Sequence, residues 1–167
     1  ETRKEVIRIK GQDDLTLNVR TTRHGPVMSD VAEPISAAAK PLGAQYVVSF
    51  QWTALRPDDR TFQASLNMGM ATDWKSFVAA LREFHSPQQN IVYADVDGNI
   101  GYIAPGLVPI RRADNDLMGL APAPGWDARY DWQGFIPFDK LPQRFNPPSG
   151  TIVTANQKIV DEIGRAH

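Results

Sequence analysis

Two short runs of strand-forming residues on either side of Asp97-Gly98 constrain the fold of this chain most strongly. The runs cover residues 91–96 and 99–104, and both are rich in β-branched and aromatic side chains. Such side chains favour extended backbone, and Asp-Gly is a preferred two-residue hairpin turn of type I′. The sequence therefore predicts an antiparallel hairpin at residues 91–104.

A helix is predicted just before this hairpin, over residues 73–84. Its apolar residues recur at spacings of three and four and share one helical face: Trp74, Phe77, Val78, Leu81 and Phe84. Thr72 or Asp73 can cap the start, because a short polar side chain accepts hydrogen bonds from the first free N–H groups. Pro87 ends the helix. An aromatic stripe at this spacing is typical of a packed core, so the helix and hairpin together predict an α+β fold.

Further strands follow from local pattern. Alternating residues predict strands at 5–10 and 15–20 with a turn of Gly and Asp residues between them. A β-branched and aromatic run predicts a strand at 46–53. Residues 61–70 mix apolar residues with an interrupting glycine, and their pattern assigns neither helix nor strand.

The chain divides into two parts near a loop that is rich in small residues. Residues 32–43 contain two prolines and a short helical pattern at 35–40, which marks a boundary. We expect residues 1–50 to form a small β-rich appendage and residues 51–167 to form the core. Within that core, residues 105–148 are predicted to be a long irregular connection, held down by its tryptophan and phenylalanine side chains.

Composition excludes several classes of function. The chain has 18 Lys and Arg residues against 19 Asp and Glu residues, a formal net charge of −1, so no basic surface indicates nucleic acid. It has no cysteine, which excludes disulfides, thiolate metal sites and a Cys nucleophile. No apolar run approaches the roughly 18 residues that span a bilayer. We therefore expect neither a nucleic-acid nor a membrane partner.

The segment 146–157 is the first candidate for a functional site. Prolines and a glycine make a stiff turn at 147–150, and the β-branched residues that follow predict a strand at 151–155. Asn156 ends that strand. A carboxamide on a rigid strand can donate its NH2 group to a developing negative charge, as an oxyanion hole requires. The alternative, which the local pattern alone favours, is that Asn156 only hydrogen-bonds its own loop.

Two other polar features are weaker candidates. His24 lies beside a tight turn, and no Ser and Asp surround it in a triad order, so a structural histidine is favoured. The acidic residues of the hairpin turn resemble the start of a calcium loop. However, Ile100 stands where an EF-hand needs glycine, and Gly106 stands where it needs an acid. The sequence also lacks the phosphate-binding, GxSxG and HExxH motifs.

Several longer motifs together resemble the penicillin acylase (penicillin amidase) family of N-terminal-nucleophile hydrolases. In chain order they are Arg23-His24-Gly25-Pro26-Val27, residues 93–102, Pro109-Ile110-Arg111, residues 132–137, Leu141-Pro142 and residues 146–157. The resemblance covers nearly the whole chain. It implies part of an αββα sandwich, joined here to a small β-rich, barrel-like N-terminal portion. It also implies hydrolysis of a linear amide by an N-terminal serine whose own α-amino group acts as the base.

The resemblance gives roles to few residues of this chain. The match at Ala155-Asn156-Gln157 falls on the family's oxyanion asparagine, which reverses the preference above and makes Asn156 the expected catalytic residue. Gln89 aligns with the family's acyl pocket at a position where some members have an apolar residue, so we expect it to contact the substrate. The sequence opens with Glu1 instead of the nucleophilic serine. We therefore expect a fragment of the large (beta) chain that is inactive alone.

The resemblance also implies partners and a location. The expected partners are the remainder of the same precursor, namely a small alpha chain and the rest of the large chain, and a small-molecule amide substrate. It implies a periplasmic or secreted enzyme with no cofactor or metal in this fragment, and leaves calcium binding by the full-length enzyme open. An acyl-homoserine lactone or cephalosporin acylase is the alternative within the family. A non-catalytic β-rich binding module is the alternative outside it.

Overall fold

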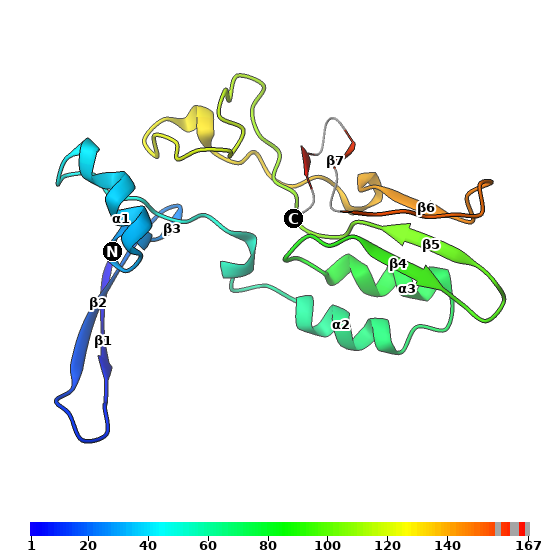
Figure 1. The fold of residues 1–167 in the computed structure, drawn as a ribbon, viewed down its shortest axis with the longest axis horizontal. Helices are drawn as coiled ribbons and strands as arrows, with labels where there is room; N and C mark the ends of the chain where they lie inside the picture. Colours follow the sequence, from blue (N-terminus) through cyan, green and yellow to red (C-terminus); the bar gives the residue numbers. More distant parts are fainter. Residues whose placement is uncertain (156–157, 161–163, 166–167) are drawn as a thin grey trace.

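The computed structural model describes residues 1–155, 158–160 and 164–165, which form an α+β fold (Figure 1). The strands are β1 (Thr2–Ile7), β2 (Leu15–Thr22), β3 (Gly25–Pro26), β4 (Ile91–Ala94), β5 (Ile100–Ile103), β6 (Gln143–Phe145), β7 (Lys158–Val160) and β8 (Gly164–Arg165). The α-helices are α1 (Glu33–Ala39), α2 (Thr61–Gly69) and α3 (Trp74–Ala80). No helix in the described ranges is long and apolar enough to cross a bilayer. The predicted α+β class is confirmed.

The N-terminal sheet is a hairpin with a very short third strand. β1 pairs antiparallel with β2, from Thr2 opposite Arg20 to Ile7 opposite Leu15, and β2 then pairs with β3. Figure 1 shows this hairpin projecting away from α1. The predicted strand at 5–10 therefore begins three residues earlier. Over the described residues, this β-rich portion is an open three-stranded sheet.

The predicted strand at 46–53 is wrong. This segment passes beside β3 but forms a single β-bridge, between Val27 and Ser49. The Phe50 N–H donates to the Pro26 carbonyl at 2.9 Å. Branched and aromatic residues favour extended backbone, but a strand also needs a neighbour along its length, and β3 is only two residues long.

The predicted helix at 73–84 is confirmed as α3 followed by a short 3-10 turn, Leu81–Glu83. A capping box starts it. The Asp73 carboxylate accepts from the Ser76 N–H at 2.7 Å, and the Ser76 hydroxyl oxygen accepts from the Asp73 N–H at 3.1 Å. Leu81 is completely buried, as expected for the apolar stripe.

Helix α2 occupies the region that the sequence left unassigned. Its buried side is small, because Ala64 is fully buried while Phe62 and Leu66 are 78% and 52% exposed. Figure 1 shows α2 and α3 on the same side of the β4–β5–β6 sheet. A helix whose large apolar residues face outward gives no amphipathic signal toward its own core. This outward-facing arrangement explains why the pattern of residues 61–70 indicated neither helix nor strand.

Helix α3 packs on the sheet through one row of residues that crosses β4, β5 and β6. Tyr93 of β4 is opposite Gly101 of β5, and Gly101 is opposite Phe145 of β6, so the three positions share one face. Trp74 of α3 lies over this row, with its ring 5.4 Å from Tyr93 and 5.3 Å from Phe145, between centroids. The absent side chain of Gly101 makes the room for the indole ring.

Replacing Gly101 by Ala is expected to lower the free energy of unfolding by about 1–3 kcal/mol, the usual cost of overpacking a core. An added Cβ would lie 2.7 Å from Cε3 of Trp74, so the ring has to move out of its stack with Phe145. Denaturant unfolding followed by tryptophan fluorescence measures the loss. Gly69→Ala is the matched control, because a Cβ there meets nothing within 4 Å. Equal stability of the two variants would contradict this packing argument.

The irregular connection folds back on itself. The Ile110 N–H donates to Gly134 O at 2.9 Å and the Ile136 N–H to Val108 O at 2.9 Å, which closes the excursion between them. The predicted aromatic anchors differ in depth, since Trp126 is 74% exposed and its ring lies 5.5 Å from that of Tyr46. β6 lies within this predicted connection and is a strand that the sequence pattern did not indicate.

Candidate functional site

The β4–β5 hairpin ends in a three-residue loop, residues 96–98. The Asp95 N–H donates to Asn99 O at 3.1 Å, and the Gly98 N–H donates to Asp95 O at 3.2 Å. Gly98 is left-handed with φ +82°, but Asp97 does not have a positive φ. A type I′ turn needs a positive φ at both central residues, so the predicted turn type is wrong although the hairpin is confirmed.

The Asp95 carboxylate organises this loop. It accepts hydrogen bonds from the Tyr93 hydroxyl (2.9 Å), the Asn99 N–H (2.9 Å), the Asn99 side-chain amide (2.8 Å) and the Asp97 N–H (3.1 Å). The Asn99 side-chain bond contributes most to holding the pKa of Asp95 below its ordinary value. Burial, with a smaller effect of Asp95, raises the pKa of Tyr93 to about 12. All these groups serve the loop itself.

The hairpin loop does not fit a calcium ion. Both oxygens of Asp95 are already occupied by protein donors, whereas a calcium site needs several carboxylate or carbonyl oxygens free to converge. Within the described ranges, no group of three or more His, Asp and Glu side chains could hold a metal ion.

Asn146 joins the end of β6 to this hairpin. Its backbone is left-handed, with φ +44°, a conformation that Asn tolerates better than most residues. Its N–H donates to Ile100 O at 2.9 Å, and its side-chain oxygen accepts from the Ile100 N–H at 2.9 Å. Its side-chain NH2 donates to the side-chain oxygen of Asn99 at 2.8 Å.

The chain reverses direction after β6 (Figure 1). The Gly150 N–H donates to Pro147 O at 2.9 Å, which closes the expected turn. The predicted strand at 151–155 is wrong, since no strand of the described part of the chain pairs with it. Branched side chains favour extended backbone but do not by themselves form a β-ladder. Asn156 follows this segment and lies outside the described residues, so its catalytic role stays a prediction.

Gln89 is an exposed residue just before β4. Its neighbours Gln88 and Asn90 each have a buried amide nitrogen with no hydrogen-bond partner in the described structure. The Asn90 side-chain oxygen accepts from the Tyr102 hydroxyl at 2.6 Å. Sequence patterns gave no signal for these neighbours, because their burial depends on the packed sheet. Substrate contact by Gln89 stays a prediction.

His24 holds the N-terminal portion against the irregular connection. Its Nε2 lies 2.9 Å from Gly125 O, which also accepts a hydrogen bond from the Arg23 guanidinium at 2.8 Å. The same guanidinium pairs with Asp131 at 2.8 Å and holds the pKa of that carboxyl below its ordinary value. These contacts support the structural interpretation of His24.

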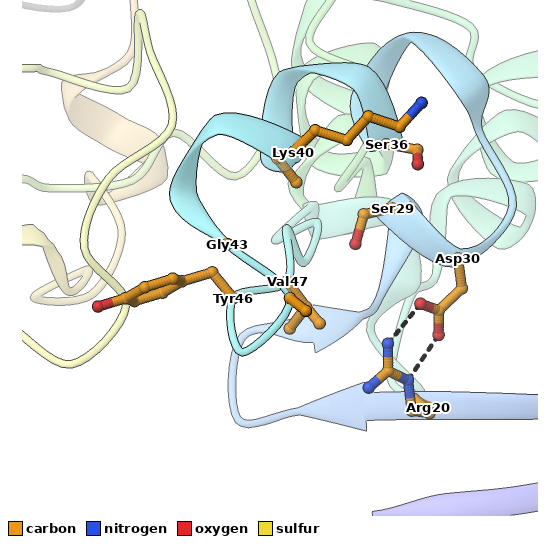
Figure 2. A pocket seen from close by; sticks show the side chains of 10 residues that line it. Arg20, Ser29, Asp30, Ser36, Lys40, Gly43, Tyr46 and Val47 are labelled. Atoms are coloured by element: carbon orange, nitrogen blue, oxygen red, sulfur yellow. Dashed lines mark hydrogen bonds and ion pairs between the residues drawn. The ribbon is translucent and has the colours of Figure 1, made fainter.

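A cleft of about 360 Å³ opens beside α1 (Figure 2). Its charged lining residues include Arg20 and Asp30, which form a bidentate ion pair with contacts of 2.7 and 2.5 Å. Arg20 holds the pKa of Asp30 below its ordinary value, which makes Asp30 a weak base. The Ser29 hydroxyl oxygen accepts from the Val48 N–H at 3.1 Å. These contacts tie Arg20, Asp30 and Ser29 to the local structure.

The motifs that meet in this structure recur together in one protein family. Residues 1–166 match the penicillin amidase family. This chain belongs to the penicillin amidase family. The matched residues include the β4–β5 hairpin, Asn146, whose hydrogen bonds to Ile100 and Asn99 clamp the end of β6 to that hairpin, and the segment that leads to Asn156.

Individual relatives within the penicillin amidase family are similar along almost the whole chain. The chain is 36% identical over 160 residues to an acyl-homoserine lactone acylase, QuiP, of Pseudomonas fluorescens, covering 96% of this chain and 18% of the relative. It is 34% identical over 158 residues to the penicillin acylase 2 proenzyme of a Pseudomonas species, covering 95% of this chain and 19% of the relative. The chain thus spans less than a fifth of the length of these curated relatives.

A solved structure supports the same fold. The chain resembles a thermostable penicillin G acylase from Alcaligenes faecalis with a TM-score of 0.78 and 31% sequence identity. The likeness covers 99% of this chain and 28% of that one. Penicillin G acylase is an N-terminal-nucleophile hydrolase, so the predicted fold class is confirmed by a protein of the expected family.

Proposed function

We propose that this chain is part of the large chain of an amide hydrolase that cleaves an acyl group from an amine. The main support for this proposal is the family match over residues 1–166, because the relatives of this chain include acylases of penicillin and of acyl-homoserine lactones. The nucleophile is an N-terminal serine located outside this chain. Asn156 donates its side-chain NH2 group to the oxyanion.

The chemistry requires these two groups together. A serine hydroxyl is a poor nucleophile until a nearby base accepts its proton, and here the base is the serine's own α-amino group. Attack on the amide carbonyl gives a tetrahedral intermediate whose negative oxygen needs preorganised donors. Asn156 follows a stiff turn that is anchored to the sheet at Asn146, which suits a donor that must not move.

The nature of the acyl group is a second part of the proposal. The two relatives above differ by only two percentage points of identity, 36% and 34%, so a penicillin-type and an acyl-homoserine lactone-type substrate both fit the family match. We propose that Gln89 contacts the acyl group. A carboxamide there disfavours a purely apolar phenylacetyl pocket, and the acyl-homoserine lactone and cephalosporin acylases stay alternatives within the family.

We also propose how the complete enzyme is assembled. The remaining contacts of the site come from a small alpha chain and from the rest of the large chain of one precursor, in a periplasmic or secreted location. The described residues of this chain contain no group of three or more His, Asp and Glu side chains that could hold a calcium ion by itself. No step of the reaction is assigned to a metal here.

The full-length protein is expected to release a primary amine from at least one of penicillin G, a cephalosporin whose side chain carries no amine, and N-acyl-homoserine lactones of different chain length. A fluorogenic amine reagent measures the release and ranks the acyl groups. The 167-residue chain alone is the matched control and is expected to release none, because nothing in it replaces the N-terminal serine. No release by the full-length protein from any substrate, or turnover by the chain alone, would refute the proposal.

A further inference from the structure

We propose that Asn146 is a positioning residue that fixes the direction of the segment carrying Asn156. The inference rests on the proposed function, because it takes Asn156 to be the oxyanion donor. Asn146 occupies the junction between β6, which ends at Phe145, and the stiff turn of residues 147–150. Its conformation therefore decides where that turn leaves the sheet.

The side chain of Asn146 replaces a missing piece of β-ladder. In an antiparallel pair, two opposite residues exchange N–H···O bonds through their backbones. Here Asn146 donates its N–H to Ile100 O at 2.9 Å, but the Ile100 N–H donates to the Asn146 side-chain oxygen at 2.9 Å. The carboxamide thus completes the pair while the left-handed backbone of Asn146 turns the chain away.

Neighbouring groups fix which way this carboxamide points. A carboxylate can only accept hydrogen bonds, so the Asp95 oxygens hold the NH2 group of Asn99, at 2.8 and 3.1 Å. Asn99 then presents its oxygen, which accepts from the Asn146 NH2 at 2.8 Å. The remaining oxygen of Asn146 faces Ile100. The order Asp95, Asn99, Asn146, Ile100 leaves one arrangement in which every amide is satisfied.

This clamp acts on catalysis through the turn that follows it. Two prolines restrict the backbone just after Asn146, so a change of its φ redirects the turn of residues 147–150 instead of being absorbed there. Most residues other than Gly and Asn avoid the left-handed conformation. A displacement of the donor by about 1 Å is enough to cost up to about a hundredfold in rate.

The test compares three variants of the full-length protein with p-nitroanilides of phenylacetic, hexanoic and decanoic acids as probes. Asn146→Gly keeps access to the left-handed backbone but loses the side-chain bonds, and Asn146→Ala loses both. Asn146→Asp keeps the acceptor for the Ile100 N–H but sets a carboxylate against the Asn99 oxygen. We expect kcat to fall by about tenfold to a hundredfold, most for Ala, with KM little changed. Titration with an irreversible sulfonyl fluoride, which labels a nucleophilic serine, counts the active sites.

A double-mutant cycle distinguishes an effect of Asn146 on the position of Asn156 from a general loss of activity. If Asn146 acts only through Asn156, then Asn146→Gly combined with Asn156→Ala has the same kcat as Asn156→Ala alone. Multiplication of the two losses, or an unchanged kcat for all three Asn146 variants, would overturn the inference while leaving the proposed function intact. A silent Asn156→Ala would instead remove the oxyanion role, and the positioning role would fall with it.

Ser76→Ala is the matched stability control. It removes the capping box of α3, which packs on the same sheet, and the described hydrogen bonds of Ser76 go only to Thr72 and Asp73, not to residues 151–155. It is expected to lower Tm with kcat per active site unchanged. An equal loss of kcat in Ser76→Ala would show that any weakening of this sheet impairs the enzyme, and would refute a specific role of Asn146.

Discussion

Replacing Asn156 by Ala in the full-length protein is expected to lower kcat by about 10²- to 10³-fold, the usual loss for one oxyanion donor. This loss corresponds to about 2.7–4 kcal/mol of transition-state stabilisation. The physical reason is that the NH2 group meets its charge only when the tetrahedral intermediate forms, so the ground state loses little. Steady-state kinetics on the substrate ranked first by amine release measures the effect, and Tm is expected to be nearly unchanged.

The alternative role of Asn156 makes the opposite prediction. If the side chain only completes a local hydrogen bond, then Asn156→Ala costs roughly 1 kcal/mol of stability and leaves the chemistry intact. Asn156→Asp sharpens the distinction, because it keeps the size of the side chain and puts a negative charge where the oxyanion forms. It is expected to be at least as damaging as Ala. Normal kcat/KM in both variants would return Asn156 to a structural role.

Local periodicity was enough to find the parts of the fold that sequence neighbours build. The hairpin around Asp97-Gly98 and the helix α3 each carry their own signal, a turn dipeptide or a stripe of apolar residues, and both are confirmed. The β1–β2 hairpin is found in the same way, shifted by a few residues at its first strand.

The parts that sequence analysis missed depend on distant partners. The segment 46–53 has the composition of a strand but meets only the two-residue β3, so it forms one bridge. Residues 143–145 have no strand composition, yet they pair with β5 across some 40 residues of chain. Helix α2 buries the small side chain of Ala64 and exposes Phe62. Propensity describes what a residue favours alone, and packing decided otherwise in each case.

The candidate site shows the same division. The match of Ala155-Asn156-Gln157 to a family motif is visible in the sequence, whereas the clamp at Asn146 is not. Asn146 precedes two prolines, which predicts a turn but not its contact with Ile100, 46 residues away. The order of amides from Asp95 to Asn146 emerges only when the hairpin and β6 are side by side. Motifs therefore pointed to the expected catalytic residue, and the structure showed the hydrogen bonds that anchor the turn before it.

Gly25→Ala is expected to destabilise the N-terminal portion by about 2–6 kcal/mol, the largest loss we expect from any single methyl group here. Gly25 has φ +130°, which an L side chain rarely adopts, and an added Cβ would overlap the carbonyl oxygen of Phe50. That carbonyl cannot move freely, because the Phe50 N–H donates to Pro26 O at 2.9 Å. The energetic costs of the backbone strain at Gly25 and of the overlap with the Phe50 carbonyl therefore add.

The control for this prediction is Gly134→Ala. Gly134 has a similar φ of +126°, but a Cβ there meets nothing within 4 Å, so this variant carries the strain alone, about 1–3 kcal/mol. Hydrogen exchange of the Val27 and Phe50 N–H groups, which bond to Arg20 O and Pro26 O, reports local opening around Gly25. Faster exchange there in Gly25→Ala than in Gly134→Ala isolates the overlap with Phe50. Equal losses of Tm in the two variants, with unchanged exchange at both amides, would contradict this prediction. They would mean that β3 and the segment around Phe50 can separate with no loss of stability, and that only the backbone angle requires glycine at position 25.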